Sequence, residues 1–319
     1  MAKSKIPEIL KRIKNFKPLE INYAFQKSIS FSQLSMYSSC PKKWSLQYRD
    51  GHKVAAPSIN MTFGTAIHET VQKYIHTMYE ESGAQADRID IEELFEERFR
   101  EAYSKEYKNN KNVHFSSSEE MREFFDDGLA ILDFIKKRRG EYFSSRGWHL
   151  VGIELPIVIV PNRSYNNVLF NGFIDLVMYN ENTETFTIYD IKTSTRGWGD
   201  KDKKDEVKQF QILLYKNYFS EQFGVSQDNI DVKFFILKRK IWEESEFPQK
   251  RIQEFVPANG KTKVNKAKTA LNTFIEEVFN TDGSYKNVEH QEQPSKSSCM
   301  FCPFKDKKDL CSSAFLVNP

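Results

Sequence analysis

Asp190 and Lys192 lie two residues apart in residues 184–194, a segment whose β-branched and aromatic side chains predict a strand. Side chains two apart on a strand share a face, so this carboxylate and this ammonium should project together. Burying two charges at an apolar strand end is costly unless they stabilise each other or a ligand. The pair therefore predicts either a structural ion pair or a functional site, and this strand alone favours neither.

A second acidic residue, Asp175, lies in another apolar segment, residues 171–179. The intervening turn is short enough to make the two predicted strands antiparallel neighbours, which would put Asp175 beside Asp190. Two carboxylates held close together repel each other strongly unless a cation lies between them. Because carboxylate oxygens suit Mg²⁺ or Mn²⁺, the spacing predicts a divalent-metal site.

The order of these residues resembles the bipartite signature of the PD-(D/E)XK nucleases. Residues 174–175 (I-D) and 190–192 (D-I-K) match its two parts, with Ile174 where the family name has proline. The signature is short, and D-x-K tripeptides are common in proteins. Further motifs therefore carry much of the resemblance.

Those motifs are typical of the RecB-type branch of that family. Residues 64–69 (G-T-A-I-H-E) resemble its histidine motif, and residues 211–215 (Q-I-L-L-Y) resemble its Q-x-x-x-Y helix. With the four cysteines, the likeness extends from Ser30 to Cys311. The proteins that the chain resembles in this way are the iron-sulfur RecB-type exonucleases, including the CRISPR-associated enzymes and the AddB nuclease domain.

The resemblance implies a role for each motif residue in metal-dependent phosphodiester hydrolysis. Lys192 would position or activate the attacking water, and Glu154, an acid in the apolar segment 148–160, would bind metal or support a ligand. Gln211 and Tyr215, four apart on one helical face, would flank the site and contact nucleic acid. The metal ligands would be three side chains and one main-chain carbonyl, those of His68, Asp175, Asp190 and Ile191.

Spacing alone gives two of these residues ordinary roles. A single histidine in a helix, as His68 would be, is usually a packed or surface group. The periodicity of the predicted helix at residues 206–223 is equally compatible with Tyr215 packing against the sheet and Gln211 being merely nearby. The catalytic assignment of these side chains thus comes from the resemblance.

The cysteines form a second candidate site. Three of the four follow the pattern C-x2-C-x8-C near the C-terminus, and the fourth, Cys40, precedes a proline near the N-terminus. With no secretory signal visible, such spacing predicts a metal site before a disulfide. Spacing leaves structural zinc and a [4Fe-4S] cluster equally open, and the resemblance implies the cluster. Its ligands would be Cys40, Cys299, Cys302 and Cys311.

These residues require an α/β fold to bring them together. We expect a single nuclease domain, residues 1–319, with a restriction-endonuclease-like core of one mixed sheet flanked by helices. A helical region at 65–147 would be inserted in it, and a cysteine module made of 30–50 and 295–313 would join the chain ends. Predicted strands also include 230–240 and 251–256, predicted helices include 206–223 and 264–279, and 198–205 is a predicted polar loop.

Composition limits the partners and the location that can be expected of the protein. The net charge of +3 is too small to name a partner, but basic clusters at 136–139, 201–204 and 238–240 could contact phosphates or form solvated faces. No apolar run approaches the roughly 20 residues of a membrane span, and no signal peptide is visible. We therefore expect a cytoplasmic protein whose partner is DNA and which has no membrane partner.

The predicted function is that of a metal-dependent DNA exonuclease preferring single-stranded ends, in DNA repair, recombination or end processing. Residues 85–146 would roof the site as a passage, and Trp198 would stack on bases. One alternative is a structure-specific endonuclease with the same core. The other is a non-catalytic or assembly-dependent nucleic-acid-binding subunit, with protein partners in a repair, recombination or CRISPR-type assembly.

Overall fold

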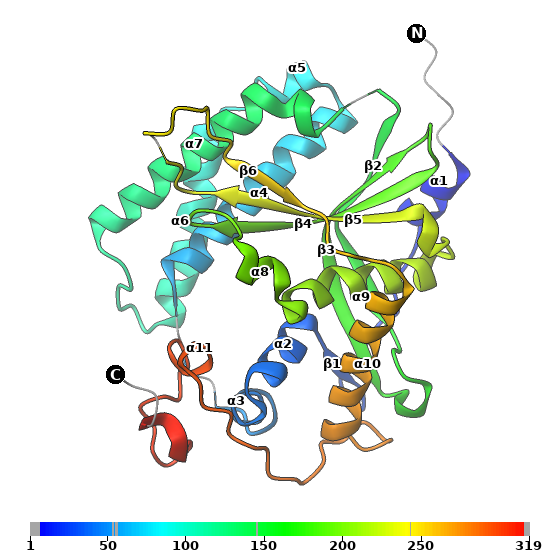
Figure 1. Cartoon of the computed structure of the whole chain (residues 1–319), viewed down its shortest axis with the longest axis vertical. Coiled ribbons are helices and arrows are strands. Elements are labelled where there is room, and N and C mark those ends of the chain that lie inside the picture. Colours follow the sequence, from blue (N-terminus) through cyan, green and yellow to red (C-terminus); the bar gives the residue numbers. More distant parts are fainter. Residues whose placement is uncertain (1–6, 53, 55–56, 145, 243, 316–319) are drawn as a thin grey trace.

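The sheet at the centre of the molecule has six strands and mixed pairing (Figure 1). In this computed structural model, residues 7–315 are described, apart from 53, 55, 56, 145 and 243. The strand order is β1-β3-β4-β5-β6, with β2 paired to β3. The strands are β1 (Lys27–Ile29), β2 (Trp148–Ile159), β3 (Val168–Asn180), β4 (Thr185–Ser194), β5 (Ile230–Lys238) and β6 (Ile252–Phe255).

The third strand, β3, forks between two neighbours. Its C-terminal half pairs antiparallel with β4, and this ladder ends at the pair Leu176 and Tyr189. Its first three residues, from Val168, pair instead with β1 in parallel. β2 pairs antiparallel along the other edge of β3. The sheet is therefore open between β3 and β4 on the β1 side of Leu176, and we call this opening the fork.

Helices cover both faces of the sheet, and the alternation of side chains explains why. Along β4, Ile188 belongs to the core on one face and Tyr189 to the core on the other. The helices are α1 (Glu8–Lys14), α2 (Phe31–Ser39), α3 (Pro41–Trp44), α4 (Ile59–Glu80), α5 (Gly83–Ala86), α6 (Ile91–Asn109), α7 (Ser118–Tyr142), α8 (Asp200–Lys204), α9 (Glu206–Phe223), α10 (Lys261–Val278) and α11 (Lys296–Cys299).

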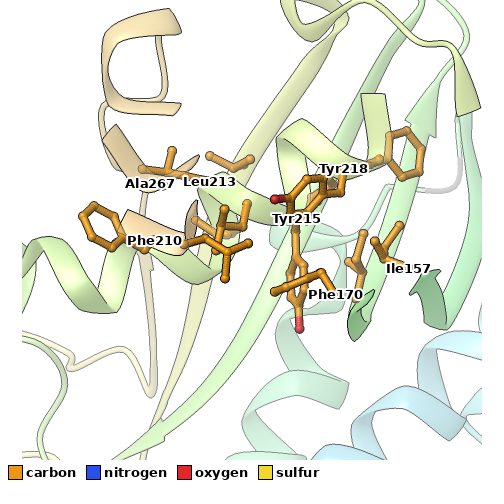
Figure 2. Close-up of a cluster of buried hydrophobic side chains, with 14 of the residues drawn as sticks. Ile157, Phe170, Phe210, Leu213, Tyr215, Tyr218 and Ala267 are labelled. Atoms are coloured by element: carbon orange, nitrogen blue, oxygen red, sulfur yellow. The ribbon is translucent and has the colours of Figure 1, made fainter. Parts of the chain in front are cut away.

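On the first face, α9 lies between the sheet and α10. Figure 2 shows side chains of α9, such as Leu213 and Tyr218, packed with Phe170 of β3 and Ala267 of α10. Polar residues fix where this helix begins and ends. The side chain of Asp205 caps its first turn, and Gly224 ends it in the left-handed conformation.

On the second face, α4, α6 and α7 form one apolar layer against the sheet. Phe63 of α4 packs edge-on against Phe95 of α6 and Phe124 of α7. Gly128 of α7 permits this approach, since a Cβ there would lie 2.3 Å from the Phe95 ring. The helical region predicted from the sequence is therefore mainly one face of the core.

The predicted strands and longer helices agree with the structure, but three short elements were not predicted: α8, β1 and the four-residue helix α11. The segment 198–205, predicted as a polar loop, contains the short helix α8, whose N-terminal amide at Gly199 is bonded to the carboxylate of Asp202. The strand β1 was not predicted, because three residues carry too little periodicity to be recognised. No helix in the described part of the chain is long and apolar enough to cross a membrane.

Candidate active site

The fork between β3 and β4 is where the predicted catalytic residues meet. Beyond Leu176 the two strands no longer pair, so the amide of Ile191 is bonded to a side chain: it donates to Asp175 Oδ2 at 2.6 Å. The carbonyl of Ile191 lies 2.8 Å from His68 Nε2. The two main-chain polar groups of Ile191 thus contact a carboxylate from β3 and an imidazole from α4.

His68 lies on the α4 face that points toward this fork. Its Nε2 is 3.3 Å from Asp175 Oδ2. Burial lowers the pKa of His68, but the Asp175 carboxylate and the Ile191 carbonyl more than offset that effect, so its pKa lies above the ordinary value. The imidazole therefore lies in a negative electrostatic potential, which would also favour a bound cation.

The third member of this group is Glu154 of β2. Ligand atoms of His68, Glu154 and Asp175 all lie within 4.8 Å of one another. Glu154 has a φ of +48°, a left-handed conformation that a non-glycine residue rarely adopts within a strand. Strained backbone of this kind persists where the surroundings impose it, and it is common at functional sites.

Gln72, which we did not predict, holds Glu154 in place. Its Nε2 donates to Glu154 Oε1 at 2.6 Å and to the main-chain carbonyl of Asp175 at 3.1 Å. The side chain is buried, one helical turn beyond His68 on the same face of α4. That i, i+4 spacing was the available signal in the sequence.

Asp190 lies apart from this group and faces α9. Its side chain is fully buried, its Oδ2 is 2.9 Å from Lys192 Nζ, and no described residue gives either oxygen a well-oriented hydrogen bond. Burial raises the pKa of Asp190 to about 6, with Lys192 opposing the shift and Asp175 adding to it. The predicted ligand set named Asp190, which is not part of the close group; the group contains Glu154, which was expected to bind metal or support a ligand.

Lys192 is held between two partners. Besides Asp190, its Nζ donates to Gln211 Oε1 of α9 at 2.8 Å. Burial lowers the pKa of Lys192, but the carboxylates of Asp190 and Asp175 raise it by more. The pKa therefore lies above the ordinary value, and the side chain is an ammonium at neutral pH. The strand-face prediction for Asp190 and Lys192 is confirmed by this contact.

Tyr215 packs over β3 beside the same site. A Cβ at Gly172 would lie 2.9 Å from its ring, so glycine is what lets the ring approach the strand. The phenol is buried, and burial raises its pKa. Gln211 reaches Lys192, while Gln209 turns away and donates to the carbonyl of Lys203.

A cleft of about 940 Å³ opens over these residues. Ser32 of α2, residues of α4 from Asn60 to Gln72, Glu154, and β4 from Ile191 to Thr193 line it. No described residue of 85–146 is among its lining, so the expected roof from that region is not seen.

The stacking role expected of Trp198 is also not supported. Its ring packs on Phe234 at a centroid distance of 4.7 Å and on Phe255 at 6.1 Å, with Lys208 over its face. Its main-chain groups are bonded to the side chain of Gln253. The sequence predicted the strand at 251–256 but not that its residue Phe255 packs on Trp198.

The four cysteines line one small cavity, together with apolar and basic side chains. All four are free, and no three of them bring their sulfurs within 4.8 Å of one another in the described chain, so a closed four-sulfur site is not seen. Burial raises the pKa of the Cys302 and Cys311 thiols, and the nearby Cys40 adds to both effects. The structure thus gathers cysteines from both chain ends.

Comparison with known proteins gives one family. The family model described as the PD-(D/E)XK nuclease superfamily matches residues 28–307. The chain is similar to the crystal structure of SSO0001, with 12% identity over 89% of this chain and 97% of that chain and a TM-score of 0.32. No curated protein sequence matches it.

The family match spans the strands, α4 and α9, which carry every side chain described at the fork. The mixed six-stranded sheet with helices on both faces agrees with the restriction-endonuclease-like fold expected from the sequence. Superfamily membership implies hydrolysis of nucleic acid with a divalent metal, and the group at the fork has donors for one. The chain therefore belongs to the PD-(D/E)XK nuclease superfamily.

Proposed function

We propose that this protein is a DNA exonuclease that requires Mg²⁺ or Mn²⁺, prefers single-stranded ends, and serves in DNA repair, recombination or end processing. The observation that carries the proposal is the convergence of His68, Glu154 and Asp175 on one point beside the Ile191 carbonyl. Carboxylate and carbonyl oxygens with one imidazole fit Mn²⁺ well and Mg²⁺ adequately.

In this proposal the chain's own groups divide the work. His68, Asp175 and the Ile191 carbonyl would bind the metal, with Glu154 as a further ligand, while Asp190 would hold the Lys192 ammonium beside it. A divalent ion held by these residues would supply a water of lowered pKa and would stabilise charge on the scissile phosphate. Gln72 keeps the Glu154 carboxylate turned toward that position.

Lys192 has a distinct part. Gln211 and Asp190 fix its ammonium from two sides, which leaves a compact, oriented charge at the edge of the metal position. From there it orients the attacking water and stabilises negative charge that develops on the phosphate. Tyr215, packed on β3, keeps α9 and Gln211 in register with the strand.

The preference for single strands is supported by how far the site is recessed. The side chains of His68 and Asp175 are 21% and 13% exposed and that of Lys192 is 34% exposed, so the reactive groups lie in a recess of the surface. A single strand can bend one phosphate into such a recess, whereas a duplex must first fray. The resemblance to RecB-type exonucleases supports the choice of an end-directed enzyme.

The cysteine cavity is part of the proposal as the site of a [4Fe-4S] cluster. A tetrahedral zinc site with Zn–S bonds near 2.3 Å requires sulfurs about 3.8 Å apart, and the four thiols line a common cavity at wider spacing. Wider spacing favours a larger, multinuclear group. Its role is to join the two ends of the chain, since both contribute ligands.

The decisive experiment uses protein purified without oxygen. Linear single-stranded DNA and the same sequence as a closed circle are incubated with Mn²⁺ or with chelator, and products are sized over time. We expect metal-dependent loss of the linear strand and a resistant circle. Equal rates on both would favour the endonuclease alternative, and binding without hydrolysis would favour the non-catalytic subunit.

A further inference from the structure

A second groove, of about 730 Å³, lies at the C-terminal ends of β4 and β5. The parallel pairing of these strands, from Phe186 and Ile230 to Ser194 and Lys238, makes them end side by side (Figure 1). The residues that line the groove are Arg196, Lys238, Lys240, Ile241, Trp242 and Gln249. Three of these six carry positive charge, and none is acidic.

Two of the cations have no acidic partner in the described part of the chain. Arg196 is exposed, and among the described residues none forms an ion pair or hydrogen bond with its guanidinium. Burial lowers the pKa of Lys238, and the charge of Arg251 adds to that effect. Lys240, in contrast, pairs with Glu123 and Asp127. An anion beside Arg196 and Lys238 would relieve an uncompensated positive field.

An aromatic ring stands beside these cations. Trp242 is 70% exposed, the most exposed of the four tryptophans, and no ring contact with another described aromatic residue covers it. Trp44, in contrast, is buried among several rings. An exposed indole beside unpaired cations is the combination that single-stranded nucleic acid requires, because its bases stack on aromatics and its phosphates need charge.

The groove is anchored close to the catalytic cleft. Thr193 lines the cleft, and Arg196 lines the groove three residues later, at most about 10 Å along the chain. The turn between them is fixed to β5: the amide of Arg239 donates to the Ser194 carbonyl at 2.9 Å, and that of Lys240 donates to the Thr195 carbonyl at 2.7 Å. The two hollows therefore have a fixed separation.

We propose that this groove binds the substrate strand beyond the scissile phosphate, with Arg196 and Lys238 on successive phosphates and Trp242 stacked on a base. The inference rests on the proposed nuclease function and names the path of its single-stranded substrate. The occupant is single-stranded nucleic acid; the amount of charge and one exposed indole do not suit a duplex, whose bases are covered.

The test measures binding alone, in chelator, by fluorescence anisotropy of a labelled 20-nucleotide single strand. Trp242→Ala should weaken binding roughly tenfold, within the usual range for loss of one base stack. Trp242→Phe should retain most of the affinity, because a ring still stacks. Replacing Arg196 and Lys238 together by Gln should reduce the slope of log affinity against log salt by about 1.4, or 0.7 for each phosphate contact.

Two matched controls lie nearby. Phe247 is 74% exposed in the same connection between β5 and β6 but does not line the groove, and Lys250 pairs with Glu141. Phe247→Ala and Lys250→Gln should bind like the wild type. The inference is overturned if Trp242→Ala and the double variant bind like the wild type, or if the controls lose as much affinity.

The same design separates this inference from the proposed function. Binding in chelator does not depend on hydrolysis, so selective loss of affinity in the groove variants supports the groove whatever the Mn²⁺ reaction shows. If every groove variant binds single strands with wild-type affinity and still cleaves them, the proposed nuclease function stands and the proposed role of the groove is rejected.

Discussion

The catalytic cleft and the cysteine cavity are built in opposite ways. Donors of the cleft come from long elements that are packed on both faces, such as the 22-residue helix α4 with His68 and the 13-residue strand β3 with Asp175. The cysteines come from helix ends and turns: Cys40 follows α2, and Cys299 ends the four-residue helix α11. One site is formed by the core, and the other lies between two chain ends.

This difference predicts what each site needs. Side chains on packed elements keep their positions without a ligand, as the contacts of Lys192 with Asp190 and Gln211 illustrate. Thiols on short turns gain their positions from the group they bind, so that binding free energy is also folding free energy. Helix α2 joins the two, since Ser32 borders the cleft and Cys40 follows its last turn, roughly 12 Å away along the axis.

The largest expected effect is on the rate of cleavage, in a variant that keeps the fold. Lys192→Met should reduce cleavage of linear single-stranded DNA on the order of a thousandfold or more, because it deletes the oriented ammonium. Circular dichroism and the thermal midpoint should show a folded protein. Lys233→Met, on the neighbouring strand and paired with Glu254, is the matched control and should cleave normally. Full activity of Lys192→Met would refute the assignment.

The next effect should fall on folding. Cys302→Ser, in protein purified without oxygen, should lose its iron and its brown colour and melt roughly 5–10 °C lower, a change of a few kcal/mol. Mn²⁺ binding by the fraction that remains folded should change little. Met300→Ala, at an exposed neighbouring position, should keep iron and stability.

The outcome of that experiment also decides the cofactor. A colourless wild type carrying one zinc per chain would replace the cluster by the zinc alternative, while the cysteine ligands would stay. Equal loss of Mn²⁺ affinity and of stability in Cys302→Ser would contradict the proposed independence of the two sites.

A smaller effect concerns pH in protein stripped of divalent metal. Burial raises the pKa of Asp190 to about 6 from an ordinary value of 3.8, so its stabilising contribution is complete below about pH 3.8 and lost as pH rises through 6. Relative to Asp190→Asn, which does not titrate, the wild type should therefore lose on the order of 2 kcal/mol of unfolding free energy between pH 4 and pH 7. Urea titrations of both proteins measure this; a constant difference would mean that Asp190 is ionised throughout.

The smallest effect should come from Gln72, which orients the proposed metal ligand Glu154. Gln72→Leu should weaken Mn²⁺ binding roughly tenfold in calorimetry, because Glu154 loses the amide that orients it. Gln209→Leu removes an equally buried glutamine of α9 whose bond is to Lys203, away from the fork, and should leave Mn²⁺ affinity unchanged. Similar losses in both variants would point to a general packing effect.

Local periodicity was enough to predict much of this arrangement. The two-residue spacing placed Asp190 and Lys192 on one face, and the short turn made β3 and β4 antiparallel neighbours. The four-residue spacing put Gln211 and Tyr215 on one side of α9, where Gln211 contacts Lys192 of β4 and Tyr215 packs on Gly172 of β3. These relations hold within one or two consecutive elements, so sequence patterns specify them directly.

Relations between distant segments were not accessible in this way. The fork depends on β1 pairing with the start of β3, and Lys27 is more than a hundred residues from Val168. The contact of Gln72 with Glu154 joins residues 82 apart, and Trp198 packs because β6 follows far downstream. Such features come from tertiary packing, which no local window contains.

The main-chain amide and carbonyl of Ile191 have a consequence for how this site would respond to a survey of substitutions. Its amide contacts Asp175 and its carbonyl contacts His68, while its side chain is buried in the core. Valine or leucine would keep both contacts, so position 191 should behave as an interchangeable apolar position. Proline alone would remove the amide. A central participant of the site is therefore nearly invisible to side-chain mutagenesis, and amide-to-ester replacement at this residue would reveal it.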